Sequence, residues 1–127
     1  MSAYLLADFI AACSKPGEVV PTRGAILTAR TDFGLATGTE LLGFVSSGGL
    51  EQPTLISTKP WKNNPNPSTR IDVDAYAFFS GTRFGYIAFL RQPATTKWLV
   101  KSFKRNTEPD PRNLSMLEAF RKKGLIQ

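Results

Sequence analysis

Residues 70–91 read RIDVDAYAFFSGTRFGYIAFLR, two runs of alternating side chains separated by Ser80-Gly81-Thr82. A period of two is typical of β-strands, because successive side chains point to opposite faces of a sheet. The short connection with a glycine predicts a tight turn, so that the two runs pair as an antiparallel hairpin. A third run, WLVKSFKR at residues 98–105, continues the pattern. The second half of the chain is therefore predicted to be a meander of antiparallel strands.

The alternation also predicts which side chains share a face of this sheet. One face of the first run carries Ile71, Val73, Ala75, Ala77 and Phe79. The opposite face carries Arg70, Asp72, Asp74, Tyr76 and Phe78. In the second run, one face carries Phe84, Tyr86, Ala88 and Leu90. In the third, strict alternation groups Lys97, Leu99, Lys101 and Phe103. Asp72 and Asp74 share a face, which predicts a solvated strand surface rather than a magnesium site.

The first 50 residues follow a helical period instead. Ser2 is suited to cap a helix that continues to about Ser14, and a second helix is predicted from Arg23 to about Thr31. A third begins near Thr37 or Thr39 and ends at Gly48-Gly49. The remaining predicted elements are a short strand over Leu55 to Lys59, an irregular loop over Pro60 to Ser68, and a C-terminal helix capped by Asn113 or Ser115.

Size and charge narrow the class of protein. A chain of 127 residues is predicted to form one domain, spanning residues 1–127, and its apolar runs are too short to cross a membrane. The N-terminal segment has no basic leader and is expected to be a mature helix, and the single cysteine favours a reducing cytoplasm as the location. Residues 1–58 hold three basic and five acidic side chains, whereas residues 59–127 hold thirteen and five. The positive charge lies on the strand-rich half, which favours an anionic polymer as ligand.

The residue inventory excludes several kinds of chemistry. The chain has no histidine and a single cysteine, Cys13, so neither a disulfide nor a cysteine- or histidine-based metal site can form within it. Cys13 lies on a predicted helix beside two alanines, which indicates core packing. No phosphate-binding glycine loop, Ser-His-Asp set or GxSxG motif is present. The sequence predicts no metal and no cofactor.

Basic and aromatic side chains are interleaved on the predicted sheet and on the loop before it. Lysine and arginine attract phosphates, and a tyrosine or tryptophan ring stacks on an unpaired base, so single-stranded RNA suits this surface. RNA also permits cleavage without a metal: the 2′-hydroxyl attacks its own phosphodiester, and the protein moves protons and stabilises the phosphorane. Lysine, arginine and tyrosine can divide that work.

Three motifs carry a resemblance to a known family. They are TRGAIL at residues 22–27, DFGL at residues 32–35 and WLVKSFKRN at residues 98–106. In this order the chain resembles the MqsR-like mRNA interferase toxins of the RelE-like superfamily, over roughly residues 15 to 106. The resemblance implies an α+β, RelE-like fold in which N-terminal helices pack on a twisted antiparallel sheet, here with an additional C-terminal helix. It also implies the toxin of a type II toxin–antitoxin module, sequestered by a cognate antitoxin.

The family places a lysine, a glutamine and a tyrosine on successive strands. The lysine aligns with Lys59 and the tyrosine with Tyr86, whereas the glutamine position falls near Ile71, where Arg70 or Asp72 is the possible substitute. The resulting hypothesis is a metal-independent endoribonuclease with Lys59 and Tyr86 as acid and base. Arg70 and Arg83 would hold the phosphate. The expected RNA contacts are Trp61, Lys62, Arg83, Lys101 and Lys104.

Two other functions fit the same residues. The first is a non-catalytic module, such as a nucleic-acid adaptor or an inhibitor, that uses the basic sheet to hold a nucleic acid or an acidic protein. The second is a structural or immunity-type partner whose charge is incidental. Binding of RNA without product formation would distinguish the adaptor from the nuclease. Weak binding of oligonucleotides would indicate the structural or immunity-type partner.

Overall fold

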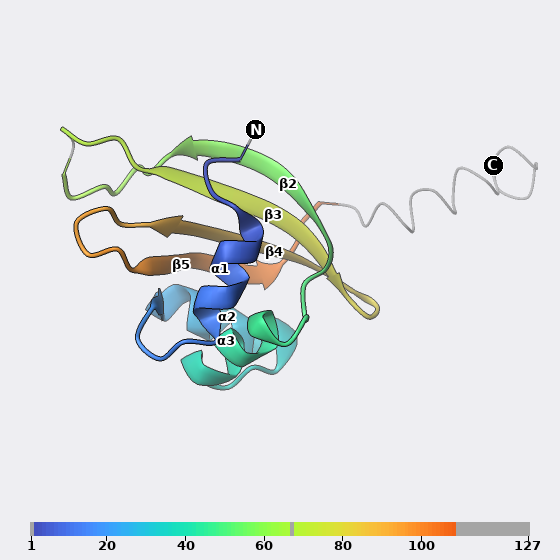
Figure 1. The fold of residues 1–127 in the computed structure, drawn as a ribbon. Helices are drawn as coiled ribbons and strands as arrows, with labels where there is room; N and C mark the ends of the chain where they lie inside the picture. The colour runs from blue at the N-terminus through green and yellow to red at the C-terminus, as the bar shows by residue number, and fades with distance from the viewer. Residues whose placement is uncertain (1, 67, 109–127) are drawn as a thin grey trace, which may run out of the picture.

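The computed structural model describes residues 2–66 and 68–108, and over these residues the chain is an α+β protein (Figure 1). The predicted helix from Asn113 lies outside the described residues. The elements in chain order are α1 (Leu6–Cys13), β1 (Val19–Pro21), α2 (Arg23–Phe33), α3 (Gly38–Ser46), β2 (Glu51–Pro60), β3 (Asp72–Ser80), β4 (Arg83–Arg91) and β5 (Trp98–Arg105).

The five strands form one mixed sheet in the order β1-β5-β4-β3-β2. The predicted hairpin is confirmed, since β3 and β4 pair antiparallel with Ser80 opposite Arg83, and β2 and β5 flank them antiparallel. The prediction of a wholly antiparallel sheet is wrong, because β1 pairs parallel with β5, with Val19 opposite Trp98. Three residues ending in a proline are too few to show a period of two, which is why β1 was not predicted.

Local sequence signals define the second and third helices. The Thr22 hydroxyl accepts the Ala25 N–H at the start of α2, and Gly34 ends that helix with φ of 70°. Thr37 and Glu40 form a reciprocal capping box at the start of α3. These caps pair backbone N–H groups that the first turn of a helix leaves without a partner. The predicted starts of both helices are therefore confirmed.

The first helix begins later than Ser2. The backbone N–H groups of Ala3 and Tyr4 donate to the carboxylate of Asp74 on β3, at 3.0 Å. The Thr58 hydroxyl on β2 donates to the same carboxylate at 2.6 Å. Asp74 is completely buried, so the prediction of a solvated strand face is wrong for this residue. A tertiary contact therefore holds residues 3–5 out of the helix.

All three helices pack on one face of the sheet, where α1 runs across the strands (Figure 1). Phe9 of α1 stacks on Phe89 of β4, with ring centroids 3.9 Å apart. Gly85 lies under the ring of Phe78, and a Cβ there would come within 2.3 Å of that ring. The large side chains that fill this core are Phe9, Leu41, Val45, Phe78, Ile87, Phe89, Val100 and Phe103. Burial of each contributes about 1.5–3 kcal/mol.

A β-bulge in β5 changes the predicted alternation. Ser102 pairs with Ala88 and Val100 pairs with Phe89, which leaves Lys101 as an extra residue without a cross-strand partner. Beyond the bulge the faces are exchanged, so that Phe103 enters the core and Lys104 lies on the opposite face. The predicted grouping of Leu99 with Phe103 is therefore wrong.

Candidate nucleic-acid interface

The sheet face opposite the helices is the candidate site, and it is called the helix-free face below. Its strand residues are Glu51, Thr54, Ser57 and Lys59 on β2, Val73, Ala75, Ala77 and Phe79 on β3, Phe84, Tyr86, Ala88 and Leu90 on β4, and Leu99, Ser102 and Lys104 on β5. Tyr4, just before α1, packs against the apolar cluster at its centre, but no residue of a described helix does so. The face is therefore available for a ligand as far as the described residues go.

The floor of this face is apolar and built from small side chains. Ala75 and Ala88 are 3% and 2% exposed, and Leu90 is completely buried. The side chains that shield them are taller and only partly buried, among them Trp61, Tyr86 and Leu99. A ligand would therefore touch the partly buried side chains rather than these residues, and rings such as Trp61 and Tyr86 are suited to flat groups such as nucleic-acid bases.

Tyr86 is the aromatic side chain nearest to positive charge on this face. It lies opposite Lys104 of β5, whose ammonium nitrogen is 5.4 Å from the centre of the tyrosine ring. Its neighbour on β3 is Ala77, which is too small to cover the other side of the ring. Tyr86 thus has a cation near its ring and a small side chain as its partner on β3.

Charge on the helix-free face is mostly positive. Lys59 and Lys104 are exposed, and Lys101 at the bulge is half-buried. Among the described strand residues that share this face, the single carboxylate is Glu51, which lies at the far end opposite Phe79 and accepts the Gly81 N–H at 2.7 Å. Phosphates that follow the lysines would therefore meet little repulsion.

The structure does not bring Lys59 and Tyr86 together. Lys59 lies opposite Val73, and continuation of the β3–β4 register places Val73 opposite Leu90, four residues from Tyr86. With about 3.3 Å per residue along a strand and about 4.8 Å between strands, the two Cα atoms lie about 16 Å apart. The side chains share a face but cannot act as acid and base on one phosphodiester in this conformation.

Arg70 and Arg83 are separated even further. Arg83 pairs with Ser80 at the hairpin end, and its guanidinium lies 5.9 Å from the ring centre of Phe33 on α2, on the helix-covered side. Arg70 precedes the other end of β3, about 33 Å away along the strand. The two predicted phosphate-holding side chains therefore do not converge, and Arg83 lies outside the helix-free face.

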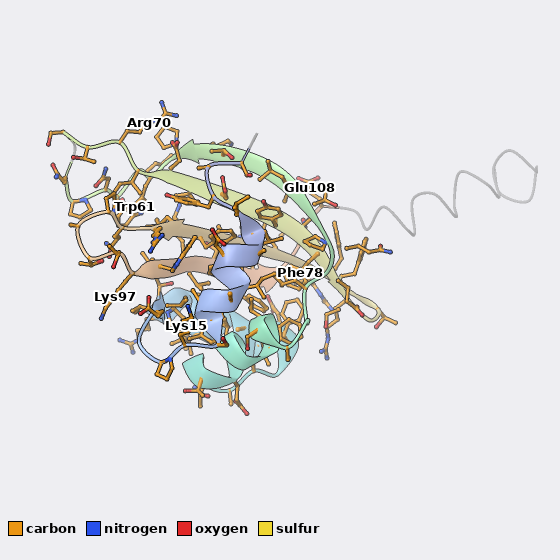
Figure 2. The ribbon with its side chains drawn as sticks, viewed as in Figure 1. Lys15, Trp61, Arg70, Phe78, Lys97 and Glu108 are labelled. Atoms are coloured by element: carbon orange, nitrogen blue, oxygen red, sulfur yellow. The ribbon has the colours of Figure 1, made fainter. Side chains whose placement is uncertain are left out.

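The loop after β2 places Trp61 and Lys62 at the Lys59 end of this face. The Trp61 N–H donates to the Ile71 carbonyl at 2.8 Å, and its half-buried ring packs against the same apolar cluster. Lys62 is exposed beside it. Figure 2 shows Trp61 and Arg70 at the same end of the molecule. The predicted residues thus form two groups, Lys59 with Trp61 and Lys62 at one end, and Tyr86 with Lys101 and Lys104 at the other.

Comparison with protein-family models, curated proteins and solved structures finds no match. Within the described residues, no helix is long and apolar enough to span a membrane. The same residues contain no group of three histidine, cysteine, aspartate or glutamate side chains that could hold a metal ion.

Proposed function

We propose that the helix-free face binds single-stranded RNA. The observation that carries this proposal is Tyr86, which pairs with Ala77 and Lys104 on the neighbouring strands and has the Lys104 ammonium close to its ring. Lys59 and Lys104 share this face, where the single carboxylate among the described strand residues is Glu51. Lys101 and Lys104 attract the phosphate backbone, and a base stacks on the Tyr86 ring. The second group, Lys59 with Trp61 and Lys62, contacts the same RNA molecule farther along its length.

The spacing of the two groups favours a polymer as ligand. A mononucleotide cannot contact Tyr86 and Lys59 together at about 16 Å, whereas a short oligonucleotide can follow the floor from one group to the other. Readout by stacking tolerates different bases, so affinity depends more on strand length and salt than on sequence. RNA duplexes bind more weakly, because their bases are already stacked.

Fluorescence anisotropy with a labelled single-stranded RNA tests this proposal. An RNA of about twelve nucleotides is suitable, because this length is within the range that single-strand-binding surfaces cover. Tyr86→Ala is expected to weaken binding by about 1–3 kcal/mol, the usual loss for one stacked base, and Tyr86→Phe to retain it. Lys15→Gln is the matched control, because Lys15 is exposed on the helix side (Figure 2). Equal affinity of Tyr86→Ala and Lys15→Gln would reject the helix-free face as the binding surface.

Metal-independent cleavage of single-stranded mRNA is a second proposal, favoured by the contact between Tyr86 and Lys104. It places a hydroxyl that can exchange a proton next to a cation that can stabilise a phosphorane. Lys59 and Arg70 lie too far away to join this pair at one phosphate, so Lys101 and Lys104 take over the electrostatic part of the reaction. This proposal corresponds to a cytoplasmic, RelE-like toxin that a cognate antitoxin silences.

Tyr86→Phe separates cleavage from binding, because it removes the hydroxyl and keeps the ring. With EDTA present, the wild type is expected to convert RNA into fragments with 2′,3′-cyclic phosphate ends, and Tyr86→Phe to bind RNA with at least about a hundredfold slower cleavage. At saturating RNA, Lys59→Ala is expected to cleave at close to the wild-type rate, because Lys59 lies too far from Tyr86 to act in the chemical step. RNA that stays intact with the wild type, although bound, would exclude the nuclease and leave the adaptor.

A further inference from the structure

A concave site lies at the end of the sheet where β3 begins and β4 ends. It is a cavity of about 460 Å³ whose lining includes Tyr4, Arg70, Ile71, Asp72, Arg91 and Thr96. Asp72 and Arg91 belong to the helix-covered side of the sheet, since their faces alternate with those of Val73 and Leu90. The cavity is therefore separate from Tyr86 and its lysines, and it is called the end pocket below.

Arg91 is held in place by two contacts. Its Nε donates to the Thr96 carbonyl at 3.1 Å, and its guanidinium lies 5.3 Å from the ring centre of Trp98. Both contacts restrict the side chain, whereas within the described residues its terminal nitrogens donate no hydrogen bond. A guanidinium fixed through Nε and stacked on an aromatic ring presents its remaining donors in a defined direction.

Arg70 also lines the end pocket and is likewise held through its Nε. Its Nε donates to Asp72 Oδ1 at 2.8 Å, and within the described residues its terminal nitrogens also have no hydrogen-bond partner. The Arg70 side chain is 69% exposed and points outward at this end of the molecule (Figure 2). Arg70, Arg91 and Asp72 together give the lining of the cavity a formal charge of +1. The fourth titratable side chain, Tyr4, is neutral.

The walls of the end pocket are fixed by long-range contacts. The Tyr4 hydroxyl donates to the Asp72 carbonyl at 2.8 Å, and its ring meets Trp98 edge-on at 5.4 Å. Burial is the largest of the causes that raise the pKa of Tyr4. A hydrogen bond with the Arg91 backbone lowers this pKa, whereas the nearby carboxylates of Asp74 and Asp72 raise it further. The phenol is therefore neutral at physiological pH and adds no negative charge.

The turn after β4 carries backbone strain beside the end pocket. Thr96 has φ of 59°, a left-handed conformation that β-branched residues rarely adopt. Its N–H donates to the Gln92 carbonyl at 2.8 Å, and its own carbonyl receives Arg91. Strained residues of this kind cluster at ligand sites, where the surrounding structure maintains them. Here the strained residue is the one whose carbonyl accepts the Arg91 Nε–H.

We propose that the end pocket binds a phosphate monoester, with Arg70 and Arg91 donating to its oxygens from two sides. Two guanidiniums with free terminal nitrogens match the geometry of a phosphate better than that of a single carboxylate. The cavity exceeds a bare phosphate and lies in the range of small-molecule sites, so the attached group is of nucleoside size and rests against Tyr4 and Ile71. The phosphate comes either from a free mononucleotide or from the 5′ end of an oligonucleotide.

Titration of the protein with adenosine 5′-monophosphate, followed by NMR or calorimetry, tests this site. Saturable binding is expected, with adenosine at least about tenfold weaker because it lacks the phosphate. Arg91→Gln and Arg70→Gln are each expected to weaken binding about tenfold or more. Arg83→Gln is the matched control, since Arg83 also lies over an aromatic ring but at the other end of the sheet. Unchanged affinity in both Arg70→Gln and Arg91→Gln would overturn the proposal.

Asp72→Asn gives a test that depends on the sign of the ligand charge. Asparagine keeps an acceptor for Arg70 Nε and removes the negative charge, so binding of the monophosphate is expected to tighten about threefold to tenfold. Weaker binding would indicate a cationic ligand and contradict the assignment. Arg70 is largely exposed, so loss of affinity in Arg70→Gln does not arise from unfolding, and a circular dichroism melt of each variant verifies this.

The two sources of the phosphate are distinguished by matched RNAs with a 5′-phosphate or a 5′-hydroxyl. A gain in affinity from the 5′-phosphate that disappears in Arg91→Gln indicates the end of a polymer, whereas binding of the free mononucleotide alone indicates a small ligand. Tyr86→Ala is expected to leave binding of the mononucleotide unchanged, so the end pocket and the helix-free face stand or fall separately. Absence of binding by both mononucleotide and 5′-phosphate RNA would reject the end pocket.

Discussion

The two faces of the same sheet differ in what their side chains do. The helix-covered face carries phenylalanines that stack on one another and on the helices, such as Phe89 with Phe9. The helix-free face carries alanines, partly buried Tyr86 and Leu99, and lysines. The helix-free face also holds a stacked pair of rings, Phe79 and Phe84, at its hairpin end. The faces therefore differ in what covers them, because described helices pack on the first and none packs on the apolar cluster of the second. Substitutions on each face are expected to separate stability from binding.

The largest expected effect is on the helix-covered face. Phe89→Ala removes a completely buried ring that stacks on Phe9 and Tyr76, and it is expected to lower the free energy of unfolding by about 3–5 kcal/mol. Urea denaturation measures this change. Tyr86→Ala on the opposite face is the comparison, since it should affect RNA binding far more than unfolding. A similar loss of stability in both variants would remove the distinction between the faces.

Asp74 and Asp72 allow a comparison of two carboxylates on one strand. Asp74→Asn removes charge from a buried group that accepts hydrogen bonds from Ala3, Tyr4 and Thr58, and a loss of about 1–3 kcal/mol in stability is expected. Asp72→Asn is the control, and a change below about 1 kcal/mol is expected because its partner Arg70 is exposed. Hydrogen exchange at Tyr4 should increase in Asp74→Asn alone. Equal effects of the two substitutions would contradict the anchoring role of Asp74.

Cys13 provides a pH-dependent test of the helix-covered side. Burial raises the pKa of its thiol to about 12, so the folded state favours the neutral thiol. Below the ordinary thiol pKa this contribution is fully present, and it is lost as pH rises from about 9 toward 12, because only the unfolded state ionises there. By pH 10 the wild type should lose about 1 kcal/mol more stability than Cys13→Ala. If the free energy of unfolding of the two proteins changed with pH in the same way, the thiol would be accessible in the folded state.

The smallest expected effects concern the lysines of the helix-free face. Lys101→Gln and Lys104→Gln are each expected to reduce the slope of log binding constant against log salt by about 0.7, the value for one phosphate contact on a single strand. Stability should change little, because Lys104 is exposed and Lys101 has no cross-strand partner. Lys15→Gln should leave the slope unchanged. A slope that depends on Lys15 as much as on Lys104 would indicate that RNA contacts the protein without regard to face.

Local sequence signals predicted the hairpin and the second and third helices, because their information lies within a few residues. Thr22 and Thr37 cap their helices, and Gly34 ends one. The first helix was predicted too long, since Asp74, some 70 residues away, binds the segment that Ser2 was expected to cap. The face of Phe103 was wrong because no local pattern reveals a bulge at Lys101.

The candidate site was predictable only in part. Tyr86, Lys101 and Lys104 follow from the composition of the strands, and the structure places Tyr86 beside Lys104. Lys59 and Tyr86 were predicted to lie together, but the structure places them apart on the same face. The alternation of side chains fixes the face of a residue but not its position along the sheet. Arg91 and Thr96 of the end pocket were not predicted at all, since their significance depends on Trp98, Tyr4 and the turn between β4 and β5.

The sequence by itself determined the α+β class, the hairpin, the absence of histidine chemistry and the positive charge of the strand-rich half. These depend on composition and on periods of two or 3.6 residues. Only the tertiary structure decided the register, the bulge, the parallel strand β1 and the burial of Asp74. Each of these depends on contacts between distant segments, where packing and hydrogen-bond satisfaction across the whole molecule outweigh local preference.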